Sequence, residues 1–477
     1  MGSSPLVTDN VNAIDTTLND DDNKKQRRIL LWKLDLFILS WACFGYFVRI
    51  LDSSNISNAY VSGLKEDLNV QGNEYNLFST LWTCGYIIGQ IPSQLIITKI
   101  RPSIWIPCAE VLWAIFSFSF AAVKNVQQVY ALRFLIGLAE SPFYVGAMTM
   151  LGNWYTPKEL GKRATIFYSA SFAANMFSGY LQAAVYKGLD GTHGLAGWRW
   201  LFIMCGVISV PGAFYGFFAV PDSPYSTKAR WLSREQVELA KSRMIKANRK
   251  PFQGVTFSVL KQLVTDVPAY FVVIGYIFFC LDTLPLGYFA IWLKALKRYS
   301  TEEVNVIPTG AYAIGFVSTI FWGWLSDQLG SRLGVTAVIS VVAFLSCLLL
   351  TVATSESVVY AGYFLNAAGW GYGAIILSWI NETYGDRPEL RAFLIGTCQT
   401  LGATFSAWVP VVIFNVGKYA PSFHKGYIVV TVLAAVQFLL VFVIKWFTLN
   451  GGTSEENETS AEENEIDAQT HKATELV

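Results

Sequence analysis

Two opposite charges stand seven residues apart in a run of apolar residues. They are Arg133 and Glu140, in the string RFLIGLAESPFYVGAMTMLGNWYTPKELGKR at 133–163. On a helix this spacing is close to two turns, so both side chains lie on one face about 10 Å apart, too far for a direct bond. An ionisable side chain inside a membrane usually faces a cavity or a partner. These groups therefore suit anion binding at Arg133 and proton exchange at Glu140; alternatively, both only tie their helix to its neighbours.

Pro142 follows Glu140 closely and affects the helix around it. Because proline has no backbone N–H, the carbonyl of Gly137 or Leu138 loses its usual helical partner. Broken helices beside charged groups recur in transporters, where they form ion and substrate sites. We therefore expect a break in the helix near Glu140. The central position of this carboxylate makes it the first candidate for carrying a proton.

A second pair of charges lies in the string YFVRILDSSNISNAYVSGLKEDL at 46–68. At 100° per residue, Arg49, Asp52 and Ser53 share one polar face of an otherwise apolar helix. The i, i+3 spacing of Arg49 and Asp52 predicts an ion pair that neutralises itself and that a substrate or a proton then opens. The alternative is an ion pair at the outer boundary of the membrane.

The remaining candidates are single polar residues within apolar stretches. Asp282 is an acidic candidate in the seventh stretch, and Glu110 is another, nearer an end of its own stretch. Because all three histidines fall in loops or tails, the proton carrier is expected to be a carboxyl group, with Asp282 as a candidate beside Glu140. Asn175 and Asn381 are expected to donate hydrogen bonds to a substrate in a cavity; alternatively, they are amides that pack helices together.

The composition indicates the medium in which these charges lie. The 477 residues are 53% hydrophobic and only 14% charged, with a mean hydropathy of +0.39, whereas soluble domains have about 25% charged residues. The chain is therefore expected in a lipid bilayer. Its net charge of +1 gives no sign of nucleic-acid binding. All seven cysteines fall in apolar stretches without a CxxC pair, so we interpret them as reduced packing residues, and no metal or cofactor is expected.

Windows of about 20 apolar residues give twelve stretches. They cover 34–59, 76–98, 103–123, 129–150, 165–187, 199–220, 268–292, 306–326, 333–353, 357–380, 392–416 and 426–448. The sequence thus predicts an all-α membrane protein with twelve transmembrane helices in two six-helix halves, 34–220 and 268–448. A cytoplasmic linker at 221–267 joins the halves, and Ser233 followed by Gln236 predicts the start of a surface helix within it.

Basic residues indicate the orientation of the chain. Lys and Arg concentrate in the tail up to Lys33, in the linker and in alternate loops, which places both termini in the cytoplasm by the positive-inside rule. The tails at 1–33 and 449–477 lack the apolar surface needed to fold and are expected to be disordered. The long polar tail before the first stretch argues against a cleavable signal peptide.

A short loop motif agrees with the two-half plan. The string GWLSDQLGSR at 323–332 is similar to the signature G-x-L-[SA]-D-x-x-G-x-R of the major facilitator superfamily, whose members have two six-helix halves. Gly323 and Gly330 are expected to permit close backbone approach and a tight turn. Asp327 is expected to pair with Arg332 or to cap a neighbouring helix. We interpret the motif as a gate hinge; the alternative is an ordinary cytoplasmic turn.

Longer strings carry a more specific resemblance. LDSSNISNAYVSGLKEDL, the string at 133–163 and GLAGWRWLFIMCGVISVPGAFYGFFAVPDSP resemble the fungal allantoate permease family, the anion:cation symporters of this superfamily, over about residues 30–450. The resemblance implies proton-coupled uptake of a small organic anion across the plasma membrane. Family members take up pantothenate, biotin, allantoate, nicotinate and sulfur compounds. The R-x6-E pattern also recurs in related animal organic-anion transporters, which implies anion or helix contact at Arg133 and proton sensing at Glu140.

One departure from the family pattern, in the first helix, narrows the choice of substrate. Many relatives carry Asp-Arg in the first helix where this chain reads Asp52-Ser53. Arg49, one turn earlier on the same face, is expected to replace the missing arginine and to grip the substrate carboxylate through two hydrogen bonds. By analogy with similar vitamin-transporter-like members, this favours pantothenate or biotin over allantoate, nicotinate or a sulfur-containing anion.

Two other classes of function compete with a symporter. A membrane enzyme is disfavoured because the sequence has no H-E-x-x-H, G-x-S-x-G or Gly-rich phosphate loop. A nutrient receptor with little flux is disfavoured because the C-terminal tail is short. The sequence therefore predicts a monomeric carrier whose partners are a small organic anion, protons and the lipid bilayer.

Overall fold

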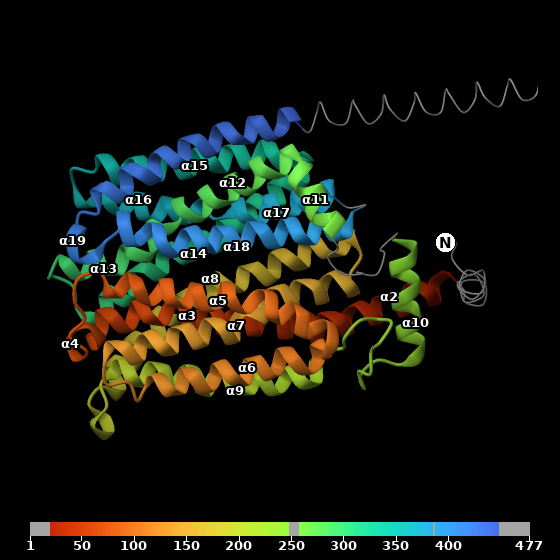
Figure 1. Ribbon diagram of the computed structural model, residues 1–477, viewed down its shortest axis with the longest axis horizontal. Helices are drawn as coiled ribbons and strands as arrows, with labels where there is room; N and C mark the ends of the chain where they lie inside the picture. The colour runs from red at the N-terminus through yellow and green to blue at the C-terminus, as the bar shows by residue number, and fades with distance from the viewer. Residues whose placement is uncertain (1–19, 248–256, 385–386, 448–477) are drawn as a thin grey trace, which may run out of the picture.

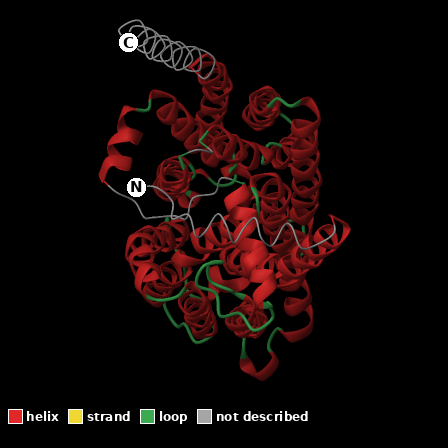
Figure 2. Ribbon diagram, turned by 90° about the vertical axis from the view of Figure 1, so that its right-hand side faces the viewer, coloured by secondary structure: helices red, strands yellow, loops and turns green. Residues whose placement is uncertain are grey.

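The computed structural model describes residues 20–247, 257–384 and 387–447, and all regular secondary structure in these ranges is helical. Long helices lie side by side along the longest dimension of the molecule (Figure 1). The view from the right-hand end shows the bundle with its helices end-on (Figure 2). Nine helices of the described part are long and apolar enough to cross a membrane. A helix suits that environment because its backbone N–H and C=O groups bond within the segment.

The N-terminal half opens with the helical segment Lys24–Asp67, which contains two short π-helical turns and is kinked at Ser62 and Gly63, where the backbone angles are not helical. The elements of this half are α2 (Asp20–Leu34), η1 (Asp35–Leu39), α3 (Ser40–Ala59), η2 (Tyr60–Leu64), α4 (Lys65–Asp67), α5 (Glu74–Lys99), α6 (Pro102–Phe120), α7 (Val126–Trp154), α8 (Pro157–Leu189), η3 (Thr192–Gly194) and α9 (Gly197–Ala219).

The linker and the C-terminal half are also built from helices. Their elements are α10 (Arg234–Lys246), α11 (Phe257–Thr265), α12 (Val267–Asp282), η4 (Leu284–Tyr288), α13 (Phe289–Ala295), α14 (Thr301–Leu329), α15 (Arg332–Val352), α16 (Glu356–Ala368), α17 (Gly371–Thr383), α18 (Pro388–Ile413), α19 (Val416–Tyr419) and a last helix, His424–Phe447. The predicted linker helix is confirmed: Ser233 and Gln236 form a reciprocal capping box at the start of α10.

Three long segments of the bundle are not among the nine apolar helices: α5, α8 and the pair α16 and α17. α5 carries Gln90 and Ser93, and α8 contains the polar string SASFAANMFSG at 169–179. The pair α16 and α17 is interrupted at Gly369 and Trp370. All three segments also border the central cavity described below. The polar residues of α5 and α8 lower their hydropathy, whereas α16 and α17, with 13 residues each, are too short to cross a membrane singly.

The two ends of the bundle differ in their contacts. We call the end with α10 and the start of α2 the linker face, and the end with α4, α13 and α19 the opposite face (Figure 1).

The first helix begins at Asp20, within the tail at 1–33 that was expected to be disordered. Lys33, in the last turn of α2, donates to the carbonyl of Trp231 (3.1 Å) and to Gln236 (3.0 Å). Residues 1–19 and 448–477 lie outside the described residues.

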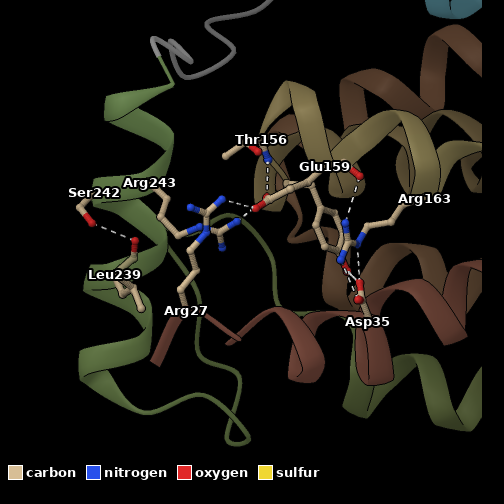
Figure 3. A network of polar contacts seen from close by, with 9 residues as sticks. Arg27, Asp35, Thr156, Glu159, Arg163, Leu239, Ser242 and Arg243 are labelled. Atoms are coloured by element: carbon tan, nitrogen blue, oxygen red, sulfur yellow. Dashed lines mark hydrogen bonds and ion pairs between the residues drawn. The ribbon is translucent and has the colours of Figure 1, made fainter. Parts of the chain in front are cut away.

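A network of charges centred on Glu159 fastens α2 and α10 to the start of α8 (Figure 3). One carboxylate oxygen accepts from Arg27 at 2.9 Å, and the other accepts from Arg243 and from the backbone N–H of Thr156. Burial alone would raise the pKa of Glu159, but the hydrogen bond from Arg27 and the charge of Arg243 together hold this pKa below its usual range. Arg163 makes a second pair with Asp35 through two hydrogen bonds.

Replacing Glu159 with Gln is expected to loosen α10. The two arginines lose their shared anion, so amide hydrogen exchange within Arg234–Lys246 should rise several-fold at neutral pH. Because the pKa is lowered in the folded state, the ionised carboxylate stabilises this attachment above the ordinary glutamate value of 4.5, and the effect is lost as the pH falls through the folded pKa.

The matched control for this change is Glu238→Gln within α10. Glu238 pairs with Lys241 of the same helix at the protein surface, so its loss should leave the exchange of α10 almost unchanged. Equal protection of α10 in the Glu159→Gln variant and in the wild type would contradict the proposed role of the network.

The predicted gate motif lies at the linker face of the C-terminal half. Arg332 pairs with Asp327 at 2.6 Å, as expected, and it also binds Glu382 of α17 at 2.7 Å. Gly330 ends α14 in the left-handed conformation (φ 57°), so the expected tight turn is confirmed. The expected close approach at Gly323 was wrong: a Cβ there would meet only a Thr165 methyl carbon at 3.9 Å.

Hydrogen bonds between the two halves close the opposite face. Asn76 at the start of α5 donates to the carbonyl of Phe414 (3.1 Å) and accepts from Tyr288 (3.2 Å). Lys294 of α13 pairs with Glu66 of α4 at 2.8 Å. These contacts join helices that are far apart in the sequence, and they define a conformation that is closed toward the opposite face.

Two glycines bring α5 and α7 into direct backbone contact. A Cβ at Gly85 would lie 2.1 Å from the carbonyl oxygen of Phe134, and a Cβ at Gly137 would lie 2.0 Å from that of Trp82. Small residues let transmembrane helices approach in this way. The crossing sets the distance between the side chains of α5 and α7 on either side of it.

Replacing Gly137 with Ala should destabilise the protein, since the added methyl group has no space and the backbone of α5 cannot yield like a flexible side chain. We expect a loss of about 1–3 kcal/mol, the usual cost of overpacking, and a lower melting temperature of the detergent-purified chain. Gly152→Ala in the same helix is the control, because a Cβ there meets nothing within 4 Å. It should be neutral or stabilising, since alanine favours helices. Equal melting temperatures for the two variants would refute the close crossing.

Candidate functional site

A cavity of about 320 Å³ lies between the two halves, within the size range of small-molecule sites. α3, α5 and α8 line it from the N-terminal half, and η4, α13 and α14 from the C-terminal half. Its polar lining consists of hydroxyl and amide side chains together with one indole: Ser53, Ser54, Ser57, Ser79, Ser171, Thr309, Tyr46, Tyr75, Tyr168, Tyr312, Asn58, Asn175, Asn305 and Trp370. Among the described residues, the lining of this cavity contains no Asp, Glu, Lys or Arg.

The charged residues of the N-terminal half lie behind this lining. Arg49 of α3 and Glu140 of α7 form a buried ion pair, with 3.4 Å between the Arg49 Nε and Glu140 Oε2 atoms. Trp82 of α5 donates its indole N–H to the same carboxylate oxygen at 3.2 Å. The guanidinium also lies over the ring of Tyr86, 4.8 Å from its centroid. The second carboxylate oxygen of Glu140 is buried without a hydrogen-bond partner.

The ion pair predicted between Arg49 and Asp52 was wrong. Asp52 instead accepts a hydrogen bond from Ser117 of α6 at 2.9 Å, while Arg49 reaches Glu140. Helical spacing places two side chains on one face, but neighbouring helices offer each of them a different partner. Arg133 and Glu140 do not pair directly, as expected; the Arg133 Nε donates to the carbonyl of Phe78 at 3.3 Å.

The break predicted in the helix at Pro142 was also wrong. α7 is continuous from Val126 to Trp154. The carbonyl of Leu138, which Pro142 deprives of its usual partner, accepts a hydrogen bond from the Ser141 hydroxyl at 2.9 Å. A neighbouring hydroxyl therefore satisfies the backbone and keeps the helix intact.

The expected substrate-binding residues divide into three groups. Asn175 lines the cavity, although its amide nitrogen is already engaged with the carbonyl of Ser171 at 2.9 Å. Arg49, Asp52 and Arg133 are buried outside the lining. Asn381 lies near the linker-face end of α17, where it donates to the carbonyl of Leu377 (2.9 Å), and it is separate from the cavity.

Asp282 ends α12 and is only 1% exposed. One of its carboxylate oxygens has no hydrogen-bond partner. Its backbone carbonyl accepts from Asn366 of α16 at 2.9 Å. Asp282 is therefore a buried acid of the C-terminal half that lies outside the cavity lining.

Three residues that complete the site were not predicted from the sequence. Trp82 binds Glu140, Ser117 binds Asp52, and Asn305 lines the cavity from α14. Local spacing gives no signal for Trp82 or Ser117, because their partners lie on other helices. Asn305 was missed because the apolar window began at 306, whereas α14 begins at Thr301.

Four of the buried charges in the N-terminal half form a cluster that balances itself: Arg49, Arg133, Asp52 and Glu140. The charge of Arg133 acts on both Glu140 and Asp52, and Arg49 pairs with Glu140. When both carboxylates are ionised the four formal charges sum to zero. Protonation of either one leaves one positive charge uncompensated, close to a cavity that is itself neutral.

Removing Arg49 should therefore destabilise the protein through Glu140. Arg49→Met leaves a buried carboxylate without its cation, for which we expect a cost of about 3–5 kcal/mol. The double variant Arg49→Met with Glu140→Gln removes both charges and should recover a substantial part of this loss in thermal unfolding. Arg49→Met with Asp52→Asn is the comparison; recovery there and not with Glu140→Gln would mean that Asp52 is the true partner.

Comparison with known proteins identifies the family to which this architecture belongs. Residues 42–410 match the profile of the Major Facilitator Superfamily. The chain belongs to the major facilitator superfamily. It is thus a multi-pass integral membrane protein and a secondary transporter, not an enzyme, and the superfamily expected from the loop motif is confirmed.

Fungal transporters are among the similar proteins of known sequence. MFS transporter PfmaC of Pestalotiopsis fici is 35% identical, covering 80% of this chain and 73% of that protein. Pantothenate transporter liz1 of Schizosaccharomyces pombe is 33% identical, covering 90% and 83%. The vitamin H transporter of Saccharomyces cerevisiae is 28% identical, covering 90% and 74%.

A solved structure shares the fold. It is a bacterial homologue of the human lysosomal transporter Spinster in an inward-facing and unoccupied conformation. It covers 87% of this chain and 98% of its own, with a TM-score of 0.66 and 12% sequence identity. At this identity the likeness concerns the fold alone.

Proposed function

We propose that this major facilitator protein imports a small organic anion together with protons, and that the substrate is a carboxylate vitamin such as pantothenate or biotin. The observation that carries this proposal is the balanced cluster of two arginines and two carboxylates directly behind a neutral cavity. Two relatives are named as a pantothenate transporter and a vitamin H transporter, and these names support the choice of substrate.

The charge balance gives a mechanism for coupling. A proton on Glu140 cancels the anion that holds Arg49, and the cluster becomes net positive. In a medium of low dielectric constant this charge acts over several ångströms, so a carboxylate in the adjacent cavity is stabilised. Release of the anion favours loss of the proton in turn. Glu140 suits this role because its second oxygen has no hydrogen-bond partner.

The two arginines act from behind the cavity wall in this proposal. Arg49 lies next to Ile50 and one turn from Tyr46, both of which line the cavity. The carboxylate of the substrate accepts hydrogen bonds from hydroxyls of the lining, while Arg49 and Arg133 supply the compensating charge. Asp282 is proposed as a second proton site, in the C-terminal half.

Alternating access would use the two faces of the bundle. In the proposed topology, twelve helices span the plasma membrane and both termini are cytoplasmic, so the linker face is cytoplasmic and the closed opposite face is external. The loop with Asp327 and Arg332 then works as the inner gate hinge. Breaking the pairs at the opposite face, such as Lys294 with Glu66, opens the cavity outward.

Uptake measurements test this function. Cells that depend on this chain should take up labelled pantothenate or biotin faster at pH 5 than at pH 7, and a protonophore should abolish accumulation. Glu140→Gln should abolish concentrative uptake but retain exchange of internal for external substrate, because a neutral residue cannot cycle a proton. Flux that is indifferent to both pH and protonophore would contradict proton coupling.

The control for this variant is Glu110→Gln. Glu110 is equally buried but lies on α6 against the Trp41 indole (3.4 Å). The Glu110→Gln variant should keep pH-dependent accumulation of substrate when its surface expression equals that of the wild type.

Uptake of allantoate, nicotinate or a sulfur-containing anion in place of the two vitamins would select an alternative substrate. Binding without any flux would indicate a nutrient receptor.

A further inference from the structure

Asn305 lines the cavity and has a buried acceptor without a partner. It lies on the first turns of α14, lines the cavity and is 2% exposed. Its amide nitrogen donates to the hydroxyl of Ser62 at 2.9 Å and to the carbonyl of Thr301 at 2.7 Å. Its amide oxygen has no hydrogen-bond partner. A buried polar atom without a partner is costly, so a ligand that supplies one gains that energy.

The orientation of this amide is fixed by its partners. A carbonyl oxygen can only accept, so the atom of Asn305 that faces the carbonyl of Thr301 must be the nitrogen. Both N–H groups are then engaged, by Thr301 and by Ser62. The one free position of the Asn305 side chain is therefore an acceptor.

Asn175 supplies a second amide oxygen to the same cavity from the other half. Its nitrogen donates to the carbonyl of Ser171, which fixes its orientation by the same argument, and no hydrogen bond to its oxygen occurs among the described residues. The two helices touch at this level: a Cβ at Gly179, one turn after Asn175, would lie 2.4 Å from the backbone carbonyl oxygen of Asn305. Each half thus contributes an amide acceptor to one cavity.

We propose that Asn305, assisted by Asn175, selects solutes that carry a hydroxyl or N–H donor in addition to their carboxylate. This inference rests on the proposed function and defines its substrate class. Pantothenate has hydroxyl groups and an amide N–H, and biotin has ureido N–H groups. Nicotinate, as the anion, has no such donor. A buried amide oxygen that is left unpaired discriminates against solutes of the last kind.

The same residue joins the solute to the closure of the opposite face. Ser62 belongs to the N-terminal half and Asn305 to the C-terminal half, so their hydrogen bond bridges the two halves. A donor group bound to the oxygen of Asn305 holds that side chain in the position in which it binds Ser62. Solutes of the proposed class therefore stabilise the conformation described here.

The test is ligand binding to the purified full chain in detergent, with labelled pantothenate, labelled biotin, allantoate and nicotinate as probes. Asn305→Ala should weaken binding of the donor-bearing probes at least tenfold. Ser62→Ala removes a partner of the Asn305 amide nitrogen but keeps the Asn305 oxygen as an acceptor, and it should weaken binding less than threefold.

A pantothenate derivative whose hydroxyls and amide nitrogen are methylated should bind the wild type and Asn305→Ala about equally. If Asn305→Ala does not fold, Asn175→Leu, at a half-buried position on the cavity, gives the same comparison with a smaller expected loss.

The outcomes separate this inference from the proposed function. Suppose that neither vitamin binds, but that allantoate binds and Asn305→Ala weakens its binding. The proposed vitamin substrates then fail, and the proposed selection for solutes with a hydroxyl or N–H donor (the donor rule) stands. If nicotinate binds as tightly as the donor-bearing probes, or if no probe shows any dependence on Asn305 or Asn175, the donor rule is overturned. The uptake experiment with Glu140→Gln tests proton coupling independently of either result.

Discussion

A guanidinium buried in the middle of a helical bundle needs an anion and oriented donors to replace the water it has lost. Glu140 provides that anion for Arg49, and Trp82 holds Glu140 in place. These contacts require α3, α5 and α7 to approach closely, which the backbone contact at Gly85 and Gly137 allows. The glycine crossing and the ion pair are thus parts of one constraint, because a wider crossing would separate Trp82 from the carboxylate.

The cavity and the charged cluster lie next to each other but are distinct. Hydroxyl and amide groups form the polar surface that a solute touches, and the arginines and carboxylates lie one layer behind it. Neutral groups can distinguish solutes by the number and direction of hydrogen bonds, while the buried charges set the net charge of the wall. In the proposed function, a proton on one carboxylate changes the electrostatics of the cavity without changing its shape.

The two faces of the bundle use polar contacts differently. At the linker face, Glu159 binds arginines of α2 and α10 on the N-terminal side, and Arg332 binds Asp327 and Glu382 within the C-terminal half. At the opposite face, the contacts of Asn76 span both halves. Contacts within a half keep each half rigid, and contacts between halves hold one conformation. This division suits the alternating access of the proposed function, in which the contacts between the halves break.

The sequence determined the medium, the apolar stretches, the cap of α10 at Ser233 and the superfamily, because composition, helical period and a short motif are local properties. It also singled out Arg49 and Glu140 as buried charges. The tertiary structure decided that these two residues pair, since periodicity assigns a face within one helix but not the helix that packs against it. It also decided that the cavity is lined by neutral groups and that Asn305 belongs to it. A hydropathy window averages over polar residues at the end of a helix, whereas packing between the two halves buries them.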